Sequence, residues 1–243
     1  MRQRTIFVVL SGVLTSGVLM SAAIACASSP ASSTASGATA GATATGSVAA
    51  PPPSPAVEGR FVLTQGSDTI GSEHFSRTND RLRAEFTARG VEAFRYDAEL
   101  APDASVKRIR LTVRPPAGGA QTSTAAFAGD SVTLTREAPG DSARSARRPA
   151  APGSVPYVNP SPSLMEQIVR RARVLGGGTA SVPVFVGGAG PANVTAVVDF
   201  AASDSARLEL GGVSVLLRVD GAGAILGGSV PSQRLTISRT AAN

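Results

Sequence analysis

His74 is the only histidine of the chain, and its neighbours determine whether it could serve as a general base. Glu73 precedes it directly, so an acid and a base are adjacent in the sequence. A serine–histidine–acid triad needs three groups that converge in space, and the chain contains no Gly-x-Ser-x-Gly nucleophile elbow. His74 and Glu73 are therefore candidate residues of a hydrolase, but the sequence favours a partly exposed structural histidine.

Metal and cofactor sites are restricted by the residue counts. One cysteine and one histidine exclude cysteine-rich zinc or iron–sulfur sites and multi-histidine metal sites. The run 187–191 has no phosphate-loop lysine, and Gly221-x-Gly223 lacks the third glycine of a dinucleotide fingerprint. We therefore expect no metal and no cofactor.

Cys26, the single cysteine, directly follows a segment with the layout of a bacterial secretory signal. Arg2 and Arg4 precede an apolar stretch that ends in small residues. The run Ala-Ile-Ala-Cys over 23–26 resembles a lipobox, which implies that residues 1–25 are removed and that Cys26 is lipidated. Alanine occupies the position three places before the cysteine, where leucine is common. Ordinary signal cleavage and an uncleaved membrane helix therefore remain as alternatives.

The segment 27–57 consists of Ala, Ser, Thr, Gly, Pro and Val, without one charged residue. Such a composition offers little apolar surface to offset the entropy of ordering, so the segment is predicted to be a disordered tether. Together with Cys26 it indicates an exported protein, anchored in a membrane and facing the periplasm or the cell surface.

Residues 58–243 are expected to form a single, mainly-β domain. Apolar and polar residues alternate over 81–89, 108–114 and several later stretches, and turn residues separate these stretches. We expect about ten to twelve strands, arranged as a strongly bent antiparallel meander sheet or an open barrel with one buried face.

One amphipathic helix is predicted over 163–175, packed against the sheet. Ser163 and Glu166 have the spacing of a capping box, and Gly176 is a natural end of the helix. The preceding stretch, 137–162, is rich in Pro, Ala, Ser and Arg and is predicted to be a long mobile loop. A curved sheet with a helix on it could enclose an apolar pocket or be filled by side chains.

Two hairpin-like stretches carry a family resemblance. The run 66–75 is similar to an early hairpin of exported bacterial β-rich domains of uncharacterised function, and 219–239 resembles their closing hairpin. The resemblance implies a meandering, half-barrel-like sheet. It implies no catalytic residue.

The charge of the chain points to a possible binding face. The formal net charge is +6, and arginines recur at every second position in two predicted strands: Arg81 and Arg83, then Arg108 and Arg110, with Arg114 beyond them. If these strands are neighbours, they form a basic face suited to an anionic component of the envelope. The alternative is an ordinary solvated face. Nucleic acid is not expected, because only 4% of the residues are aromatic and the chain is predicted to be exported.

Three functions remain open. The leading hypothesis is a lipid-anchored, non-enzymatic domain of the cell envelope that binds an apolar ligand or an envelope partner. The second is a structural or assembly scaffold of the envelope, which would use a sheet edge or the basic face. The third is a hydrolase that uses His74.

Overall fold

The computed structural model describes residues 55–241, except for 90, 116–118 and 188–192. The expected signal segment, Cys26 and nearly all of the expected tether lie outside the described residues. The first strand begins at Val57, so the last residue of the expected tether belongs to the sheet.

The described chain contains strands in two runs, separated by one α-helix. The first run is β1 (Val57–Gln65), β2 (Asp68–Arg77), β3 (Arg81–Ala88), β4 (Val91–Leu100), β5 (Val106–Arg114), β6 (Gln121–Ala128), β7 (Ser131–Glu137), β8 (Arg144–Pro149) and β9 (Val155–Tyr157). After helix α1 (Pro162–Leu175) come β10 (Thr179–Val186), β11 (Asn193–Ala202), β12 (Ser205–Leu210), β13 (Val213–Val219), β14 (Ile225–Val230), the short 3-10 helix η1 (Pro231–Gln233) and β15 (Leu235–Ala241).

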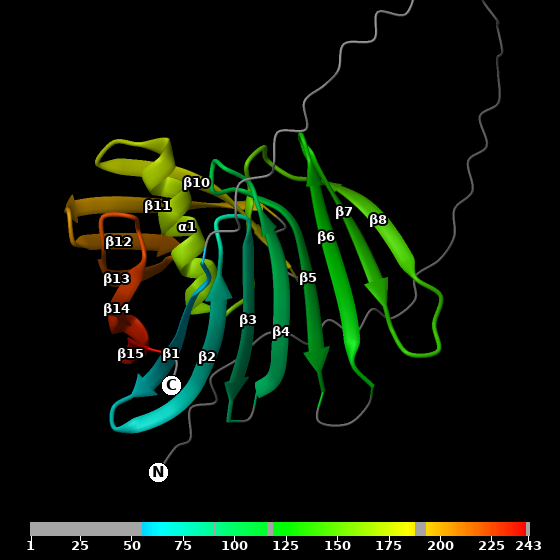
Figure 1. Ribbon diagram of the computed structural model, residues 1–243, viewed down its shortest axis with the longest axis horizontal. Helices are drawn as coiled ribbons and strands as arrows, with labels where there is room; N and C mark the ends of the chain where they lie inside the picture. The colour runs from blue at the N-terminus through cyan, green and yellow to red at the C-terminus, as the bar shows by residue number, and fades with distance from the viewer. Residues whose placement is uncertain (1–54, 90, 116–118, 188–192, 242–243) are drawn as a thin grey trace, which may run out of the picture. The chain divides into compact units, whose positions relative to one another are not determined.

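All fifteen strands belong to one sheet, in the order β8 to β1 followed by β15 to β9. Nearly every strand pairs antiparallel with its neighbour in the sequence, and the first strand pairs with the last over Gly59–Gln65. β9 pairs with β10 in parallel. β8 and β9 end the sheet and do not pair with each other, so the sheet is open and the prediction of a bent, open antiparallel meander is confirmed. Figure 1 shows the curved sheet.

One face of the sheet forms the core, because apolar residues occupy every second position. In β3 the buried residues are Leu82, Ala84 and Phe86, and charged side chains alternate with them on the outer face. Phe86 stacks on Phe94 of β4 with ring centroids 5.0 Å apart. These regular pairs give the sheet a continuous apolar inner surface.

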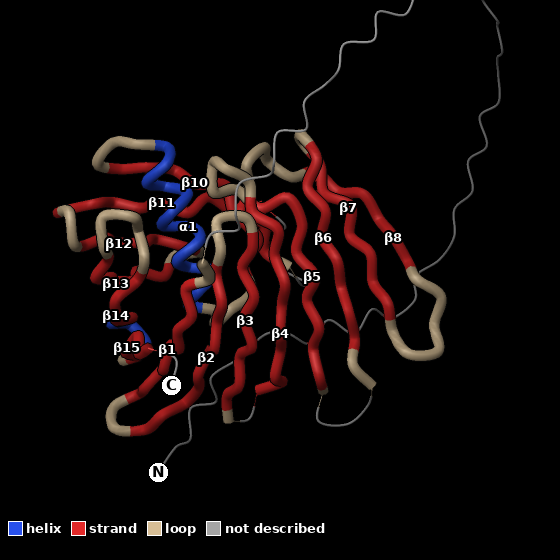
Figure 2. The backbone as a smooth tube through the Cα atoms, viewed as in Figure 1, coloured by secondary structure: helices blue, strands red, loops and turns tan. Residues whose placement is uncertain are grey.

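Helix α1 lies on this inner surface and contacts strands from both arms of the sheet, namely β2, β9, β10, β11 and β14 (Figure 2). A sheet must curve strongly for one short helix to touch strands so far apart in its order. The helix begins after Ser161, whose Oγ accepts a hydrogen bond from the Leu164 amide, and ends at Gly176, which has a φ of 79°. The expected capping box is wrong, because Ser161 rather than Ser163 is the N-cap and Glu166 lies in the core.

The stretch 137–162, expected to be a loop, contains two strands. β8 pairs with β7, and all six of its residues are exposed, so no alternation of apolar and polar residues marks it in the sequence. β9 has only three residues, and all three are buried. Strands of these kinds also explain why the structure has more strands than the alternation predicted.

Candidate functional site

Glu73 lies at the centre of a buried polar cluster at the N-terminal end of α1. Its carboxylate accepts hydrogen bonds from Ser161 Oγ at 2.6 Å, from the Ser163 amide at 2.8 Å and from Tyr96 Oη at 3.1 Å. All four residues are less than 4% exposed. Burial raises the pKa of Glu73 above its ordinary value, and the hydrogen bonds counteract only part of this effect. Desolvation also raises the pKa of Tyr96.

His74 does not take part in this cluster. Adjacent residues of a strand point to opposite faces, so Glu73 faces the core while His74 is exposed on the outer face. The strand partners of His74 are Arg60 in β1 and Glu85 in β3. The structure therefore separates the two candidate catalytic residues, and the serines that approach Glu73 are on the other side of the sheet from His74.

Glu166, in the second turn of α1, is the centre of a second buried cluster. Its carboxylate lies 3.0 Å from Arg170 Nε, 3.1 Å from Arg239 Nη1 and 3.4 Å from Arg77 Nε. It also accepts a hydrogen bond of 2.9 Å from the Ile225 amide. Three guanidinium groups thus face one carboxylate, which leaves an excess of positive charge beside the helix.

Arg77 ends β2 and extends beneath the helix. Its Nη1 donates to Gln167 Oε1 at 2.6 Å, and Gln167 Nε2 donates in turn to the Ala104 carbonyl at 2.6 Å. Desolvation lowers the pKa of Arg77 to about 10, although Glu166 acts in the opposite direction. Its Nη2 is buried and has no hydrogen-bond partner among the described residues.

An open groove of about 430 Å³ lies beside this second cluster and is here called the helix groove. Val57 and Val174, on its rim, are 53% and 55% exposed. The lining residues come from the start of β1, the β2–β3 turn, the β4–β5 connection, the C-terminal half of α1 and the β13–β14 turn. They are Pro55, Val57, Arg77, Thr78, Asn79, Leu100, Ala101, Pro102, Ala104, Gln167, Arg170, Arg173, Val174 and Ala222.

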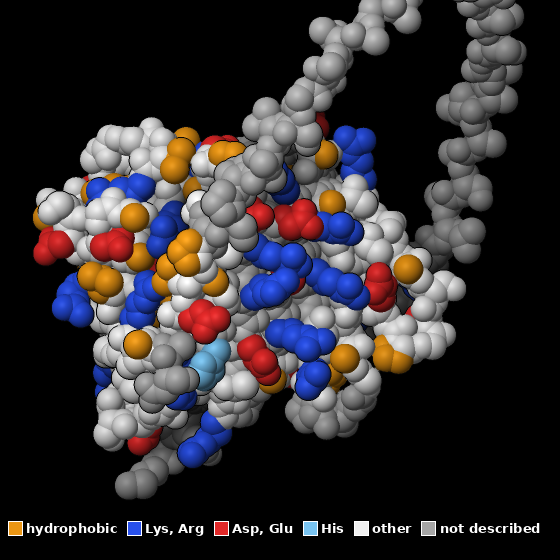
Figure 3. Space-filling view, in the orientation of Figure 1, with side chains coloured by type: hydrophobic (Ala, Val, Ile, Leu, Met, Phe, Trp, Pro, Cys, Tyr) orange, Lys and Arg blue, Asp and Glu red, His pale blue; other side chains and the backbone are white. Residues whose placement is uncertain are grey.

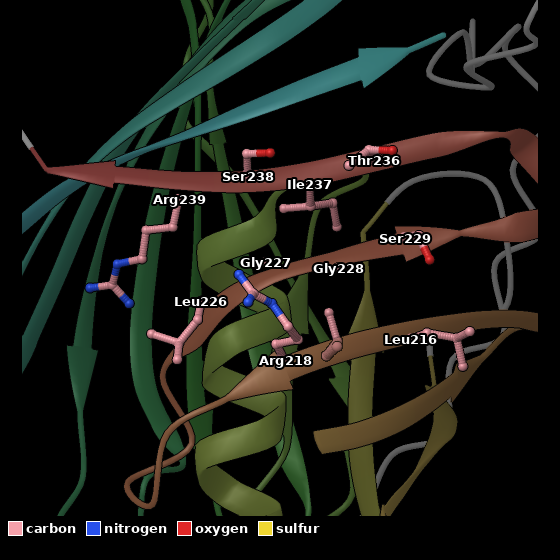
Figure 4. A pocket seen from close by; sticks show the side chains of 11 residues that line it. Leu216, Arg218, Leu226, Gly227, Gly228, Ser229, Thr236, Ile237, Ser238 and Arg239 are labelled. Carbon is pink, nitrogen blue, oxygen red and sulfur yellow. The ribbon is translucent and has the colours of Figure 1, made fainter. Parts of the chain in front are cut away.

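A second open groove, of about 460 Å³, crosses β13, β14 and β15 (Figure 4). Leu216 and Leu226 project from its edges and are 47% and 44% exposed. Its floor contains Gly228, where a Cβ would lie 2.6 Å from the Leu216 carbonyl oxygen, so the close approach of β13 and β14 requires glycine. Both of these hollows in the described part of the chain are open grooves.

The arginines of the expected basic face are on the outer surface, but acidic residues separate them. β4 lies between β3 and β5, and its Asp97 accepts from Arg81 at 2.6 and 2.7 Å and from Arg83 at 3.2 Å. Arg110 lies 3.6 Å from Glu137. Figure 3 shows blue and red side chains interspersed on this face.

The two remaining arginines of the expected basic face differ. Arg108 is opposite Glu99 in the strand register, whereas Arg114 is opposite Ala93. The face is therefore of mixed charge and is not an uninterrupted basic stripe.

Among the described residues, no three His, Cys, Asp or Glu side chains are grouped so that they could hold a metal ion. In the same part of the chain, no helix is long and apolar enough to cross a membrane.

Arg77 and Gln167 are the groove residues that the sequence analysis missed. Arg77 follows an alternating strand and precedes a turn, which resembles any strand end. The adjacent polar residues Glu166 and Gln167, which interrupt the apolar side of the helix, were the available signal for a buried polar cluster.

No known family model matches the chain, and no curated protein matches its sequence. Two solved structures are similar in fold. A DUF1089 family protein from Pseudomonas aeruginosa is 16% identical, with a TM-score of 0.50 over 69% of this chain and 92% of that chain. A β-barrel-like protein of the DUF1849 family from Brucella abortus is 9% identical, with a TM-score of 0.43 over 77% of this chain and 95% of that one. The similarity to the DUF1089 family protein shows the fold alone: this chain contains a β-rich domain similar to a domain of unknown function.

Proposed function

We propose that this protein is a lipid-anchored domain of the bacterial cell envelope that binds a ligand at the helix groove and does not catalyse a reaction. The observation that carries the binding function is the groove itself, in which buried Arg77 lies next to apolar side chains that are more than half exposed. An exposed apolar rim around a buried cation is a costly surface for a domain to keep unless something binds there.

The anchor part of the proposal rests on the sequence. Cys26 directly follows an apolar segment with small residues at its end, and an uncharged stretch joins it to the domain. The described chain enters the domain at the helix groove, because Pro55 and Val57 are part of its lining. A tether attached there leaves the rest of the groove within reach of the anchored end.

The non-enzymatic part is supported by the placement of the polar residues. His74 and Glu73 point to opposite faces of β2, and Glu73 is fully buried beneath the helix. A general base must come within hydrogen-bond distance of the proton that it removes, and Glu73 has no exposed surface for a substrate. Its hydrogen bonds instead join the helix to the sheet.

The anchor is tested by metabolic labelling with an alkyne fatty acid, followed by membrane fractionation of cells that produce the full chain. The natural chain should incorporate the label and sediment with membranes. Cys26→Ser should lose the label, whereas Ser28→Ala, two residues away, should keep it. An unlabelled natural chain, or a label that survives Cys26→Ser, would overturn the anchor.

Ligand binding is tested on the same purified full chain by native mass spectrometry and by organic extraction of copurified molecules. We expect a bound small molecule that Val174→Asp removes. Copurification that is the same for Val174→Asp and the natural chain would place the ligand elsewhere and overturn binding at the helix groove.

A second candidate function is a scaffold that assembles through the open sheet edge. β8 is an edge strand with all six residues exposed, and it carries Arg144, Arg147 and Arg148. An unpaired strand edge can accept a further strand, and these arginines favour an acidic one. Crosslinking in envelope fractions should give a partner that Ala146→Pro abolishes. If Ala146→Pro leaves every crosslink intact, the edge is not used.

A further inference from the structure

The walls of the helix groove combine positive charge with an absence of acidic side chains. Arg77, Arg170 and Arg173 belong to the described lining, and no aspartate or glutamate does. The nearest carboxylate partner, Glu166, already faces three guanidinium groups. One carboxylate cannot neutralise three cations, so the groove wall has a net positive charge available for an anion.

Arg77 belongs to this wall and has an unused donor, which is itself buried. The residue is 8% exposed, and its Nη2 has no hydrogen-bond partner among the described residues. A buried guanidinium nitrogen without an acceptor is costly, and a phosphate or carboxylate oxygen is the acceptor that arginine binds best.

The guanidinium groups of Arg170 and Arg173 have different roles. Arg170 uses Nε for Glu166 at 3.0 Å, and its side chain is 25% exposed. The Arg173 guanidinium is 3.7 Å from the centroid of the Phe200 ring and donates to the Ser203 carbonyl, so only its stem is left for the groove. Arg77 and Arg170 are therefore the two cations that a ligand would meet.

The groove also has an apolar lining. Val57 from β1 and Val174 from α1 are each more than half exposed, and Leu100 and Pro102 belong to the same lining. The volume of about 430 Å³ lies within the range of small-molecule sites. A ligand that matches both kinds of lining has a charged group and an apolar part.

We propose that the helix groove binds an amphipathic anion, with a phosphate or carboxylate head at Arg77 and Arg170 and a short apolar chain against Val57, Leu100 and Val174. This deepens the proposed function, on which it rests, by naming the class of ligand. Three acids lie close to lining residues in the sequence. Asp103 is paired with Arg171 at 2.9 Å, Asp80 accepts from Thr78 Oγ1 at 2.7 Å, and Asp220 accepts hydrogen bonds from the amides of Ala222 and Ala224.

The proposal is tested by isothermal titration of the purified full chain with hexyl phosphate, inorganic phosphate and hexanol, all at submicellar concentration. Hexyl phosphate should bind at least about tenfold more tightly than either single-feature probe, because only it can contact both the arginines and the apolar lining. Binding should weaken as salt is added. Equal affinity for hexyl phosphate and inorganic phosphate would show a plain anion site and overturn the amphipathic ligand. Equal affinity for hexyl phosphate and hexanol would overturn the role of the arginines.

Two neighbouring helix residues provide a matched pair of variants. Val174→Asp places a carboxylate in the groove, one helical turn from Arg170, and should weaken hexyl phosphate binding by at least about tenfold. Leu175→Asp is the control, because Leu175 is 46% exposed and is not part of the lining. The affinity of Leu175→Asp for hexyl phosphate should stay within about twofold of that of the natural chain. Val57→Asp, on β1, repeats the test should Val174→Asp fail to fold.

Equal losses in Val174→Asp and Leu175→Asp would overturn the assignment to the groove. This outcome is independent of the anchor: a chain that binds hexyl phosphate but is not labelled at Cys26 would refute only the anchored location. A labelled chain without hexyl phosphate binding would refute only the ligand class.

Discussion

At the N-terminal end of α1 the carboxylate of Glu73 is surrounded by neutral hydroxyl and amide donors, whereas in the next turn the carboxylate of Glu166 is surrounded by three guanidinium groups. Both carboxylates are at most 1% exposed. The neutral cluster is closed on every side, while the charged cluster borders the helix groove through Arg77 and Arg170.

The difference indicates two roles for buried polar groups: those around Glu73 stabilise the fold, whereas those around Glu166 are also placed to bind a ligand. The neutral donors around Glu73 hold the helix start against β2 and β4, and each of them is satisfied within the protein. The cluster around Glu166 has more cations than carboxylates and an unpaired nitrogen on Arg77. We therefore expect substitutions in the first cluster to affect stability alone, and substitutions in the second to affect both stability and binding.

The largest effect is expected for Glu166→Ala. It leaves buried Arg77 and partly buried Arg170 and Arg239 without their shared carboxylate, and loss of one partner of a buried ion pair typically costs about 3–5 kcal/mol. Urea denaturation at pH 7 would measure the loss. Glu137→Ala is the control, because the Arg110–Glu137 pair is more than half exposed on both sides. If the two variants are equally stable, the charged cluster does not hold the helix.

Tyr96→Phe is expected to cost about 1–3 kcal/mol, the usual price of leaving buried hydrogen-bonding groups unpaired. The Tyr96 hydroxyl lies 2.6 Å from Ser163 Oγ, 3.0 Å from Ser161 Oγ and 3.1 Å from Glu73. Thermal unfolding would compare it with Tyr157→Phe, which loses only a bond of 3.3 Å to Asn159. Equal losses would mean that the shared hydroxyl is not central to the neutral cluster.

Glu73→Gln is expected to change the pH dependence of stability. Burial raises the pKa of folded Glu73 above its ordinary value of 4.5, so the folded chain binds this proton more tightly than the unfolded chain does. The stabilising contribution is full below pH 4.5 and is lost as pH rises through the folded pKa.

Glutamine does not ionise, and it can keep its carbonyl toward the Ser163 amide while donating to the hydroxyls. Glu73→Gln should therefore gain stability relative to the natural chain as pH rises from 4 to 8, in chemical denaturation at several pH values. A constant difference between the two chains over this range would show that Glu73 does not bind its proton more tightly after folding.

The smallest effect is expected on the outer face. Asp97→Ala removes the shared partner of Arg81 and Arg83, but exposed pairs of this kind contribute about 0–1 kcal/mol. It should also leave hexyl phosphate binding unchanged, because this face is not part of the helix groove. A loss of hexyl phosphate binding in Asp97→Ala would show that the anion binds on the outer face. The two buried clusters would then not differ in ligand binding.

Local pattern predicted the elements whose neighbours in space are also neighbours in sequence. The alternation over 81–89 and 108–114 gave β3 and β5, and the apolar stripe gave α1, because one buried face is visible in a single stretch of sequence. β8 and β9 were missed for the opposite reason. Neither has a buried and an exposed face, so their pairing depends on strands that the local sequence does not describe.

The site was predicted poorly because its residues meet only in the folded chain. Arg77 and Gln167 are 90 positions apart, and Arg239 comes from the last strand. Glu73 was noticed through its neighbour His74, although strand geometry sends the two side chains to opposite faces. Its actual partners, Ser161 and Ser163, lie 88 and 90 positions further along the chain.

The pairing of β1 with β15 has a consequence for how the domain is made. Gly59 is opposite Ala241, so one edge of β1, the first described strand, pairs only with β15, the last described strand. Such contacts between distant segments slow folding, since the ends must meet before the ladder can form. The growing chain therefore cannot complete its sheet ahead of its final strand. Removing β15 would leave both β1 and β14 with an unpaired edge in the middle of the sheet.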